Sequence, residues 1–145
     1  MCDYIYLDGL NDVSSDNTTV SFNIDERMYK HKNNNKKMFM SVEQVQFRGY
    51  IDSNYNTNAC ELISNIQMVN YHNTSGLKTI MQIDAIYTDA TGLLQSVACT
   101  NNYDMKYEIN IQNEISFRIR YLNEYVALTG AYFKLLLKFE YEDIN

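Results

Sequence analysis

Hydrophobic and polar residues alternate along much of the chain, and the alternation is most regular in its last third. Every second residue is apolar between Ile115 and Tyr121, and the same pattern returns from Phe133 to Tyr141. A period of two places successive side chains on opposite faces of a β-strand. A helix over the second segment would spread its Phe and Leu side chains around most of the circumference. Both segments are therefore predicted to be strands.

Alternation of the same kind, interrupted by Asn-, Asp- and Gly-containing turns, predicts eight strands and no helix. The predicted strands span residues 18–24, 37–48, 61–71, 78–87, 93–99, 103–111, 115–121 and 131–141. Residues 4–7 are compatible with a further short strand at a sheet edge. Eight antiparallel strands in a chain of 145 residues favour two packed sheets or a barrel.

The apolar parity changes within the predicted strand 37–48. Apolar residues occupy even positions up to Val42 and odd positions from Val45 onward. An extra residue in one strand of an antiparallel pair produces such a change of phase. The sequence therefore predicts a β-bulge or bend near Glu43 or Gln44.

One face of these strands is expected to form the core between the two sheets. The residues predicted to be buried there are Phe22, Ile83, Ile109, Phe117, Ile119, Phe133, Leu135 and Leu137.

Composition indicates a single domain over residues 1–145, with residues 1–17 as an N-terminal arm or edge strand. No apolar run approaches the roughly 20 residues that span a bilayer, and the acidic start does not resemble a secretory signal. Cys2, Cys60 and Cys99 are widely spaced, so they are expected to be reduced and folding is expected in the cytoplasm. The net charge of −6 disfavours a direct nucleic-acid partner.

The sequence contains no recognisable set of catalytic residues. His31 and His72 are the only histidines, and neither lies next to a nucleophile in a recognisable motif. Five Gly form no phosphate-binding loop. We therefore expect no enzyme activity, no cofactor and no metal. The thirteen Tyr suit surfaces that become half-buried on assembly, although sheet-face residues with solvated hydroxyl groups are an equal alternative.

Charge is unevenly distributed along the first quarter of the chain. The N-terminal segment is acidic, whereas residues 30–37 combine four Lys and one His with three Asn. The segment is either a solvated loop or a contact for an acidic neighbour, such as the N-terminal segment of another copy. The candidate subunit-contact residues are Lys30, Lys32, Lys36, Lys37, Asp3, Asp8 and Asp12.

Two parts of the chain resemble a known family. Residues 37–47 and 55–58 look like the early strand and following loop of single jelly-roll capsid proteins. Residues 113–120, 128–130 and 134–140 are similar to the last two strands of those proteins. The relatives are the penton and minor capsid proteins of large double-stranded DNA viruses and virophages.

The resemblance implies an eight-stranded antiparallel jelly-roll β-sandwich and a structural role in an icosahedral capsid. The implied role is the penton protein at the five-fold vertices: a homopentamer that contacts neighbouring capsid proteins and resides in the virion after synthesis in the host cytoplasm. Arg48-Gly49-Tyr50 departs from the family, which has a Pro-Asn-Ser-like run there. A jelly roll requires 103–111 and 115–121 to lie in different sheets, with Gln112–Glu114 as the corner.

Two alternatives remain open at this point. One is a minor capsid or cement protein of the same fold. The other is a β-sandwich that binds carbohydrate or protein through a concave aromatic face. Tyr103, Tyr107 and Tyr121 share a parity that would build such a face if their side chains were exposed.

Overall fold

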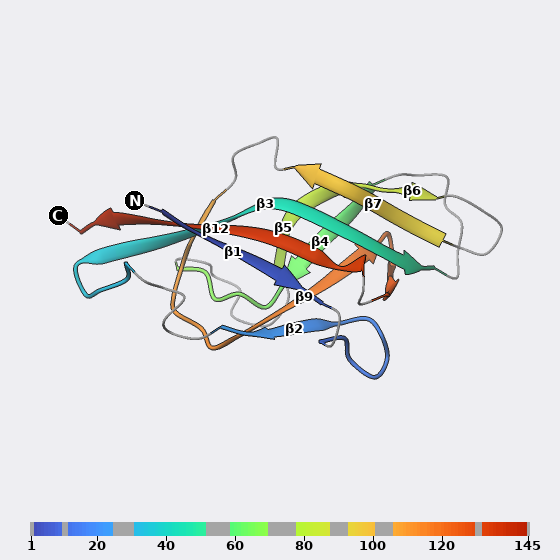
Figure 1. Cartoon of the computed structure of the whole chain (residues 1–145), viewed down its shortest axis with the longest axis horizontal. Helices are drawn as coiled ribbons and strands as arrows, with labels where there is room; N and C mark the ends of the chain where they lie inside the picture. Colours follow the sequence, from blue (N-terminus) through green and yellow to red (C-terminus); the bar gives the residue numbers. More distant parts are fainter. Residues whose placement is uncertain are drawn as a thin grey trace.

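The computed structural model describes residues 2–9, 12–24, 31–51, 59–69, 78–87, 93–100, 106–129 and 132–144. Within these ranges the chain consists of strands, turns and extended segments, and none of it is α-helical. No helix in the described part of the chain is long and apolar enough to cross a membrane. Figure 1 shows the strands in chain order, with both termini at the same end of the molecule.

Twelve strands form the described structure. They are β1 (Cys2–Asp8), β2 (Val20–Asn23), β3 (Lys36–Tyr50), β4 (Ala59–Ser64), β5 (Lys78–Asp84), β6 (Ile86–Tyr87), β7 (Leu93–Thr100), β8 (Tyr107–Ile109), β9 (Glu114–Tyr121), β10 (Glu124–Tyr125), β11 (Ala127–Leu128) and β12 (Lys134–Asp143).

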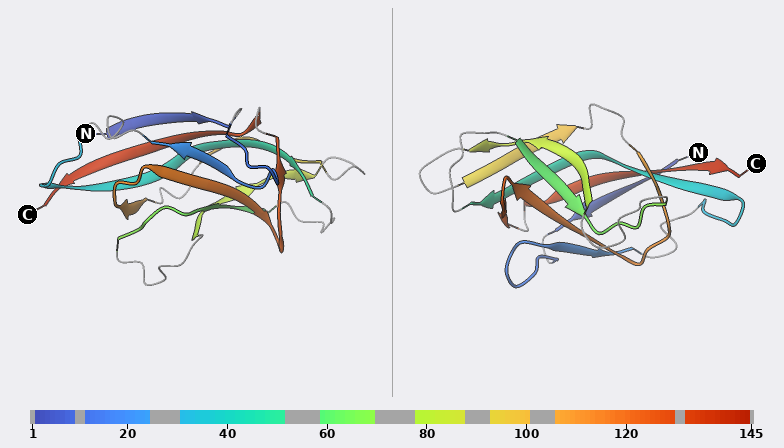
Figure 2. Two further views of the ribbon diagram at one scale, coloured as in Figure 1. Left: turned by 90° about the horizontal axis from the view of Figure 1, so that it is seen from below. Right: turned by 180° about the vertical axis from the view of Figure 1, so that it is seen from behind.

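The strands form two antiparallel sheets that pack face to face, which confirms the predicted all-β sandwich. Sheet A has the order β1-β12-β3-β7-β6, and β8 and β11 also pair with β3. Sheet B has the order β10-β9-β4-β5, and β2 also pairs with β9. The left view of Figure 2 shows β1, β12 and β3 in one layer and β2, β9 and β4 in the other.

The strands pair in a nested order, in which strands near the start of the chain pair with strands near its end and inner strands pair with each other. β1 pairs with β12, β2 with β9, β3 with β7 and β4 with β5. The chain changes sheets at six of the eleven steps between successive described strands, including all three steps from β1 to β4. In particular, β8 pairs with β3 in sheet A and β9 belongs to sheet B. The segment between β8 and β9 is a corner between sheets, as predicted.

The predicted bulge lies at Glu43. On β12, Leu137 pairs with Val42 and the preceding Leu136 pairs with Gln44, so Glu43 is the extra residue in β3. The bulge changes which parity of β3 faces inward, and it lets the 15-residue strand follow the curved sheet.

Several predicted strand boundaries were wrong. β3 continues to Tyr50 instead of ending at residue 48, because its last two residues pair with both β7 and β11. The predicted strand 78–87 divides at Ala85, where the chain passes from β5 in sheet B to β6 in sheet A. Within 61–71, β4 ends at Ser64 and Met68 forms an isolated bridge to Ile109.

Two further strands are shorter than predicted within the described residues. β8 covers only residues 107–109 of the predicted strand 103–111, and residues 103–105 lie outside the described ranges. β12 begins at Lys134, three residues later than predicted, and Ala131 is likewise outside those ranges.

All eight residues predicted for the core are buried, with exposed fractions of 5% or less. They belong to a single hydrophobic cluster that includes side chains from both sheets. At its centre, the ring of Phe22 lies 6.1 Å from that of Phe117 and 6.5 Å from that of Phe133. Phe22 and Phe117 come from sheet B and Phe133 immediately precedes β12 of sheet A, so this aromatic group joins the two sheets.

Candidate functional site

The basic segment lies at the end of sheet A that also holds the chain termini (Figure 1). The Lys32 ammonium donates hydrogen bonds to the carbonyl oxygens of Asn33, at 3.1 Å, and of Lys36. The Lys36 ammonium lies 3.1 Å from a carboxylate oxygen of Asp143. Lys37 is exposed on the sheet. Two of the predicted contact lysines therefore stabilise their own subunit, and Lys37 presents its charge to solvent; Lys30 lies outside the described residues.

The predicted acidic residues are divided between the two ends of sheet A. Asp3 accepts a hydrogen bond from the Tyr141 hydroxyl at 3.0 Å, and its other oxygen lies 3.3 Å from Nε2 of His31. Asp3 is therefore a neighbour of the basic segment within one subunit. Asp8 is exposed and lies toward the opposite end, and Asp12 is exposed beside β2, where its carbonyl oxygen accepts a hydrogen bond from the Ser21 amide at 3.1 Å.

The register of β12 gives the scale of this separation. Asp8 pairs with Lys134 and Lys37 pairs with Glu142. Eight residues of strand separate the two positions on β12, which corresponds to roughly 26 Å. Sheet A thus carries acidic side chains at one end and an exposed lysine at the other.

Between these ends, the outer face of sheet A carries a network of ion pairs. Lys106 lies 2.9 Å from Glu140 and 3.4 Å from Glu142, and Lys138 lies 2.8 Å from Glu140. Hydrogen bonds from Lys138 and Lys106 lower the pKa of the Glu140 carboxyl below its ordinary value. The network balances charge on a solvated sheet face, where each pair contributes little to stability.

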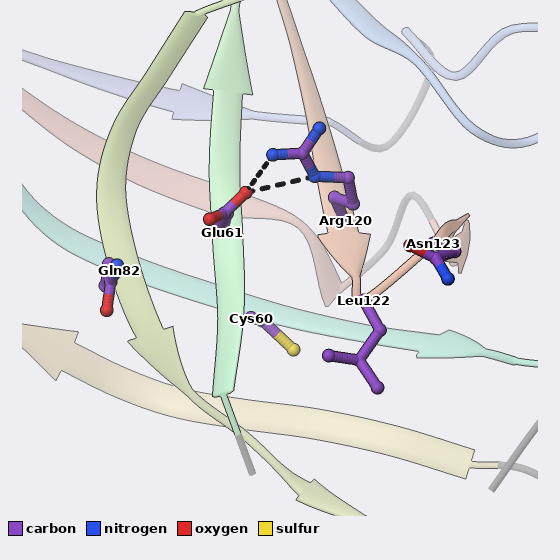
Figure 3. Close-up of a pocket in the computed structure, with 6 residues that line it drawn as sticks. All are labelled: Cys60, Glu61, Gln82, Arg120, Leu122 and Asn123. Atoms are coloured by element: carbon purple, nitrogen blue, oxygen red, sulfur yellow. Dashed lines mark hydrogen bonds and ion pairs between the residues drawn. The ribbon is translucent and has the colours of Figure 1, made fainter. Parts of the chain in front are cut away.

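A pocket opens on the outer face of sheet B (Figure 3). It is lined by Cys60, Glu61, Gln82, Arg120, Leu122 and Asn123. Gln82, Glu61 and Arg120 form one cross-strand row, because Glu61 pairs with Gln82 on β5 and with Arg120 on β9. The Arg120 guanidinium donates two hydrogen bonds to one oxygen of Glu61, with the bond from Nε at 3.0 Å.

The pocket lacks an activated nucleophile. Burial raises the pKa of the Cys60 thiol to about 12, with a smaller contribution from the nearby Asp84 carboxylate. The thiol is therefore protonated at neutral pH, and the thiolate is the reactive form. No group of three or more His, Cys, Asp or Glu side chains in the described ranges is placed to hold a metal ion. His72 lies outside those ranges.

Sequence reasoning did not identify this pocket. Four of its residues come from three strands and two from the turn after β9, and the sequence shows only the polar parity of Glu61, Gln82 and Arg120. The turn that closes the pocket was also hard to recognise, because Leu122 adopts a φ of 51°, a conformation that usually favours Gly or Asn.

The aromatic face expected of a binding module is not formed by Tyr107 and Tyr121. The Tyr121 side chain is completely buried in the core. Tyr107 is half-buried, and its hydroxyl donates a hydrogen bond to the carbonyl oxygen of Ile80 at 3.2 Å. Tyr103 lies outside the described residues. Tyr107 and Tyr121 therefore point into the sandwich rather than toward solvent.

The turn before β2 supplies a prediction for pH dependence. The Asp16 carboxylate accepts hydrogen bonds from the Ser14 hydroxyl and from the backbone amide and hydroxyl of Thr18. These bonds, that of Ser14 foremost, lower the pKa of Asp16 from 3.8 to about 2. A lowered pKa in the folded state means that the carboxylate stabilises the fold above its unfolded-state pKa of about 3.9.

We expect this stabilisation to be lost as the pH falls from about 4 to about 2. An NMR titration of the Asp16 carboxyl carbon should show the low midpoint directly. In the Asp16→Asn variant, the unfolding free energy should vary less with pH across the same interval. An ordinary midpoint near 3.9 would contradict the hydrogen-bonded turn.

Comparison with known proteins adds no relative from which a role could be transferred. No protein-family model, curated protein or solved structure matches this chain.

Proposed function

We propose that this protein is a structural subunit of an icosahedral virus capsid, and that it forms a homopentamer at the five-fold vertices. In this role it contacts neighbouring capsid proteins in the virion and carries out no chemistry of its own. The observation that carries the proposal is the nested pairing of its strands.

Nested pairing is what results when one long antiparallel hairpin is wrapped around a core. The first major strand then pairs with the last, the second with the next to last, and so on inward. β1–β12, β2–β9, β3–β7 and β4–β5 follow this order. The order supports an eight-stranded jelly roll, a double-sheet architecture of viral capsid proteins among others. Together with the resemblance in residues 37–47, 55–58, 113–120, 128–130 and 134–140, it favours a capsid role over other sandwich functions.

The distribution of charge supports contacts between different ends of neighbouring subunits. Asp12 is exposed beyond the end of β1, and Lys37 is exposed at the far end of sheet A. Different patches that complement each other form heterologous contacts, which close into a ring when the rotation allows it. Each exposed ion pair contributes about 0–1 kcal/mol, so charge would set the register of the contact more than its strength. Tyr and apolar contacts would supply most of the adhesion.

A minor capsid or cement protein with the same fold is a close variant of this proposal. The carbohydrate- or protein-binding module has weaker support, because the aromatic residues that would build its face include the buried Tyr121.

Native mass measurement of the purified protein tests the proposal. Five copies of the 17.0 kDa chain give a ring of about 85 kDa. Reversal of one charge, as Lys37→Glu or Asp12→Lys, should weaken the ring, most strongly at low salt. The two changes combined should restore it, because the opposite charges face each other again.

Glu114→Lys is the matched control, since it alters an exposed carboxylate by the same charge on sheet B. Its assembly should equal that of the wild type. Equal assembly of all variants would remove the charge argument. A wild-type protein that is strictly monomeric and never enters virus particles would overturn the capsid proposal.

A further inference from the structure

β1 is the outermost strand of sheet A, and it pairs with β12 alone. No described residue pairs with its other edge. Alternate backbone amide and carbonyl groups of an edge strand point away from the sheet, so they are available to a strand from another chain. In the left view of Figure 2, β1 is the uppermost strand of its layer.

This edge lacks the features that usually prevent pairing between chains. β1 contains no Pro, Lys or Arg, and its seven residues pair with β12 in continuous register without a bulge. Asp3, the charge nearest its middle, is already engaged by Tyr141 and His31. Tyr4 and Tyr6 are the most exposed of the large hydrophobic side chains, at 58% and 59%. The strand therefore combines an edge that pairs with no described strand with an aromatic outer surface.

Tyr4 and Tyr6 lie symmetrically on either side of Ile5 in β1. The sequence there runs Asp3-Tyr4-Ile5-Tyr6-Leu7-Asp8. An antiparallel partner with the same sequence, centred on Ile5, would place Tyr4 opposite the partner's Tyr6 twice on the outer face. No Asp would lie opposite another Asp, because Asp3 would face the partner's Leu7 and Asp8 would face the partner's Cys2. Cross-strand aromatic pairs stabilise a sheet, whereas like charges directly opposite destabilise it.

We propose that the free edge of β1 binds the β1 of a second copy of this chain. The two strands pair antiparallel about Ile5, and sheet A continues across a two-fold axis from one subunit into the next. All seven residues of each strand take part in this register. A shift by two residues in either direction would leave two of them unpaired.

This contact is separate from the ring contact of the proposed function. A two-fold contact uses the same surface on both subunits, whereas a ring uses two different surfaces. The β1 contact would join copies in pairs, and it needs neither Lys37 nor Asp12. Its success or failure is therefore distinguishable from that of the capsid proposal, since Lys37→Glu should leave it unchanged.

Disulfide formation tests the register. Residues directly opposite in an antiparallel pair have Cα atoms about 4.5–5.5 Å apart, which is within the range for a disulfide. Cys2 is exposed and unpaired by any disulfide. In the proposed register it faces the partner's residue 8, so mild oxidation of Asp8→Cys should give a dimer linked between positions 2 and 8. Peptide mapping by mass spectrometry identifies the linked cysteines.

Tyr6→Cys is the matched control, because position 6 faces the partner's Tyr4 and not Cys2. Oxidation of the Tyr6→Cys variant should give little dimer linked by a disulfide between positions 2 and 6. The wild type should also remain unlinked, because the two Cys2 residues would be roughly 20 Å apart. Preferential linkage through position 6 would overturn the proposed register.

Charge variants test the contact without a thiol. Tyr4→Lys with Tyr6→Lys places Lys opposite Lys, and the dimer dissociation constant measured by sedimentation should rise at least tenfold. Tyr4→Lys with Tyr6→Glu places opposite charges together and should dimerise more strongly than the double-Lys variant. Tyr50→Lys with Tyr125→Lys, two other exposed Tyr positions, should leave dimerisation unchanged.

Circular dichroism should show the same β-sheet spectrum for every variant, because the substituted side chains are exposed. Dimerisation that is equally strong in the double-Lys variant would overturn the contact. A wild type that shows no two-fold association at millimolar concentration, together with no linkage in the thiol variants, would overturn it as well.

Discussion

Phe117→Ala is expected to lower the free energy of unfolding by about 3–5 kcal/mol. The Phe117 side chain is completely buried at the centre of β9. Its ring contacts Phe22, which in turn lies against Phe133 from the other layer. Removal of the ring leaves a cavity between two sheets whose strands are held by pairing on both sides, so the core has little freedom to collapse. Phe133→Ala should have an effect of the same size.

Urea denaturation followed by circular dichroism measures both losses. Phe39→Ala is the matched control, because Phe39 has the same side chain but lies on the outer face of β3 and is half-exposed. Its loss of stability should be clearly smaller. A loss below about 1 kcal/mol at both Phe117 and Phe133, where cavity formation normally costs several times more, would mean that the two faces of the strands are inverted.

Gly49→Ala is expected to lower the free energy of unfolding by about 1–3 kcal/mol, the usual cost of overpacking. A Cβ atom at Gly49 would overlap Cγ1 of Val126 and would come within 2.7 Å of the carbonyl oxygen of Ala127. Val126 is completely buried, and the oxygen belongs to the backbone of β11. Neither group can retreat without separating β11 from β3.

Gly9→Ala provides the comparison for this substitution. A Cβ atom at Gly9 would lie 3.1 Å from Val20, 3.2 Å from Cβ of Phe133 and 3.3 Å from its carbonyl oxygen. These contacts are tight but need only small shifts, so the loss should be smaller than at Gly49. The Gly49→Ala, Val126→Ala double variant should lose less stability than the sum of the two single losses. The reason is that the two substitutions act on the same contact. A Gly49→Ala protein as stable as the wild type would contradict the close packing of β11 on β3.

The period of two was sufficient to predict most strands and the buried face of each. Phe117 and Phe133 were assigned to the core from parity alone, and both are buried. The change of parity in β3 was equally informative, because an extra residue must shift every later side chain to the other face; it located the bulge at Glu43. These features are local, so the amino-acid order is enough to determine them.

Features that depend on contacts between distant segments were decided only by the tertiary structure. The pocket on sheet B required Glu61 to pair with Arg120, 59 residues away in the chain. Asp3 was grouped with the other acidic residues by sequence, but the pairing of β1 with β12 brings it to Tyr141 and His31. Tyr121 was grouped with Tyr103 and Tyr107 as a candidate binding face, but the packing of sheet B on sheet A buries it together with Phe117 and Ile119.

The same distinction explains where the strand boundaries were wrong. Ala85 carries no turn signal, yet the chain leaves sheet B there because β6 finds its partner in β7 of sheet A. The predicted strand 37–48 ended before Tyr50, but pairing with β11 and β7 keeps Tyr50 in β3. Alternation of side chains thus determined which residues form strands and which faces are buried. The choice of partner strand, and with it the ends of strands and the neighbours of each charge, depended on hydrogen bonds and packing between residues far apart in the chain.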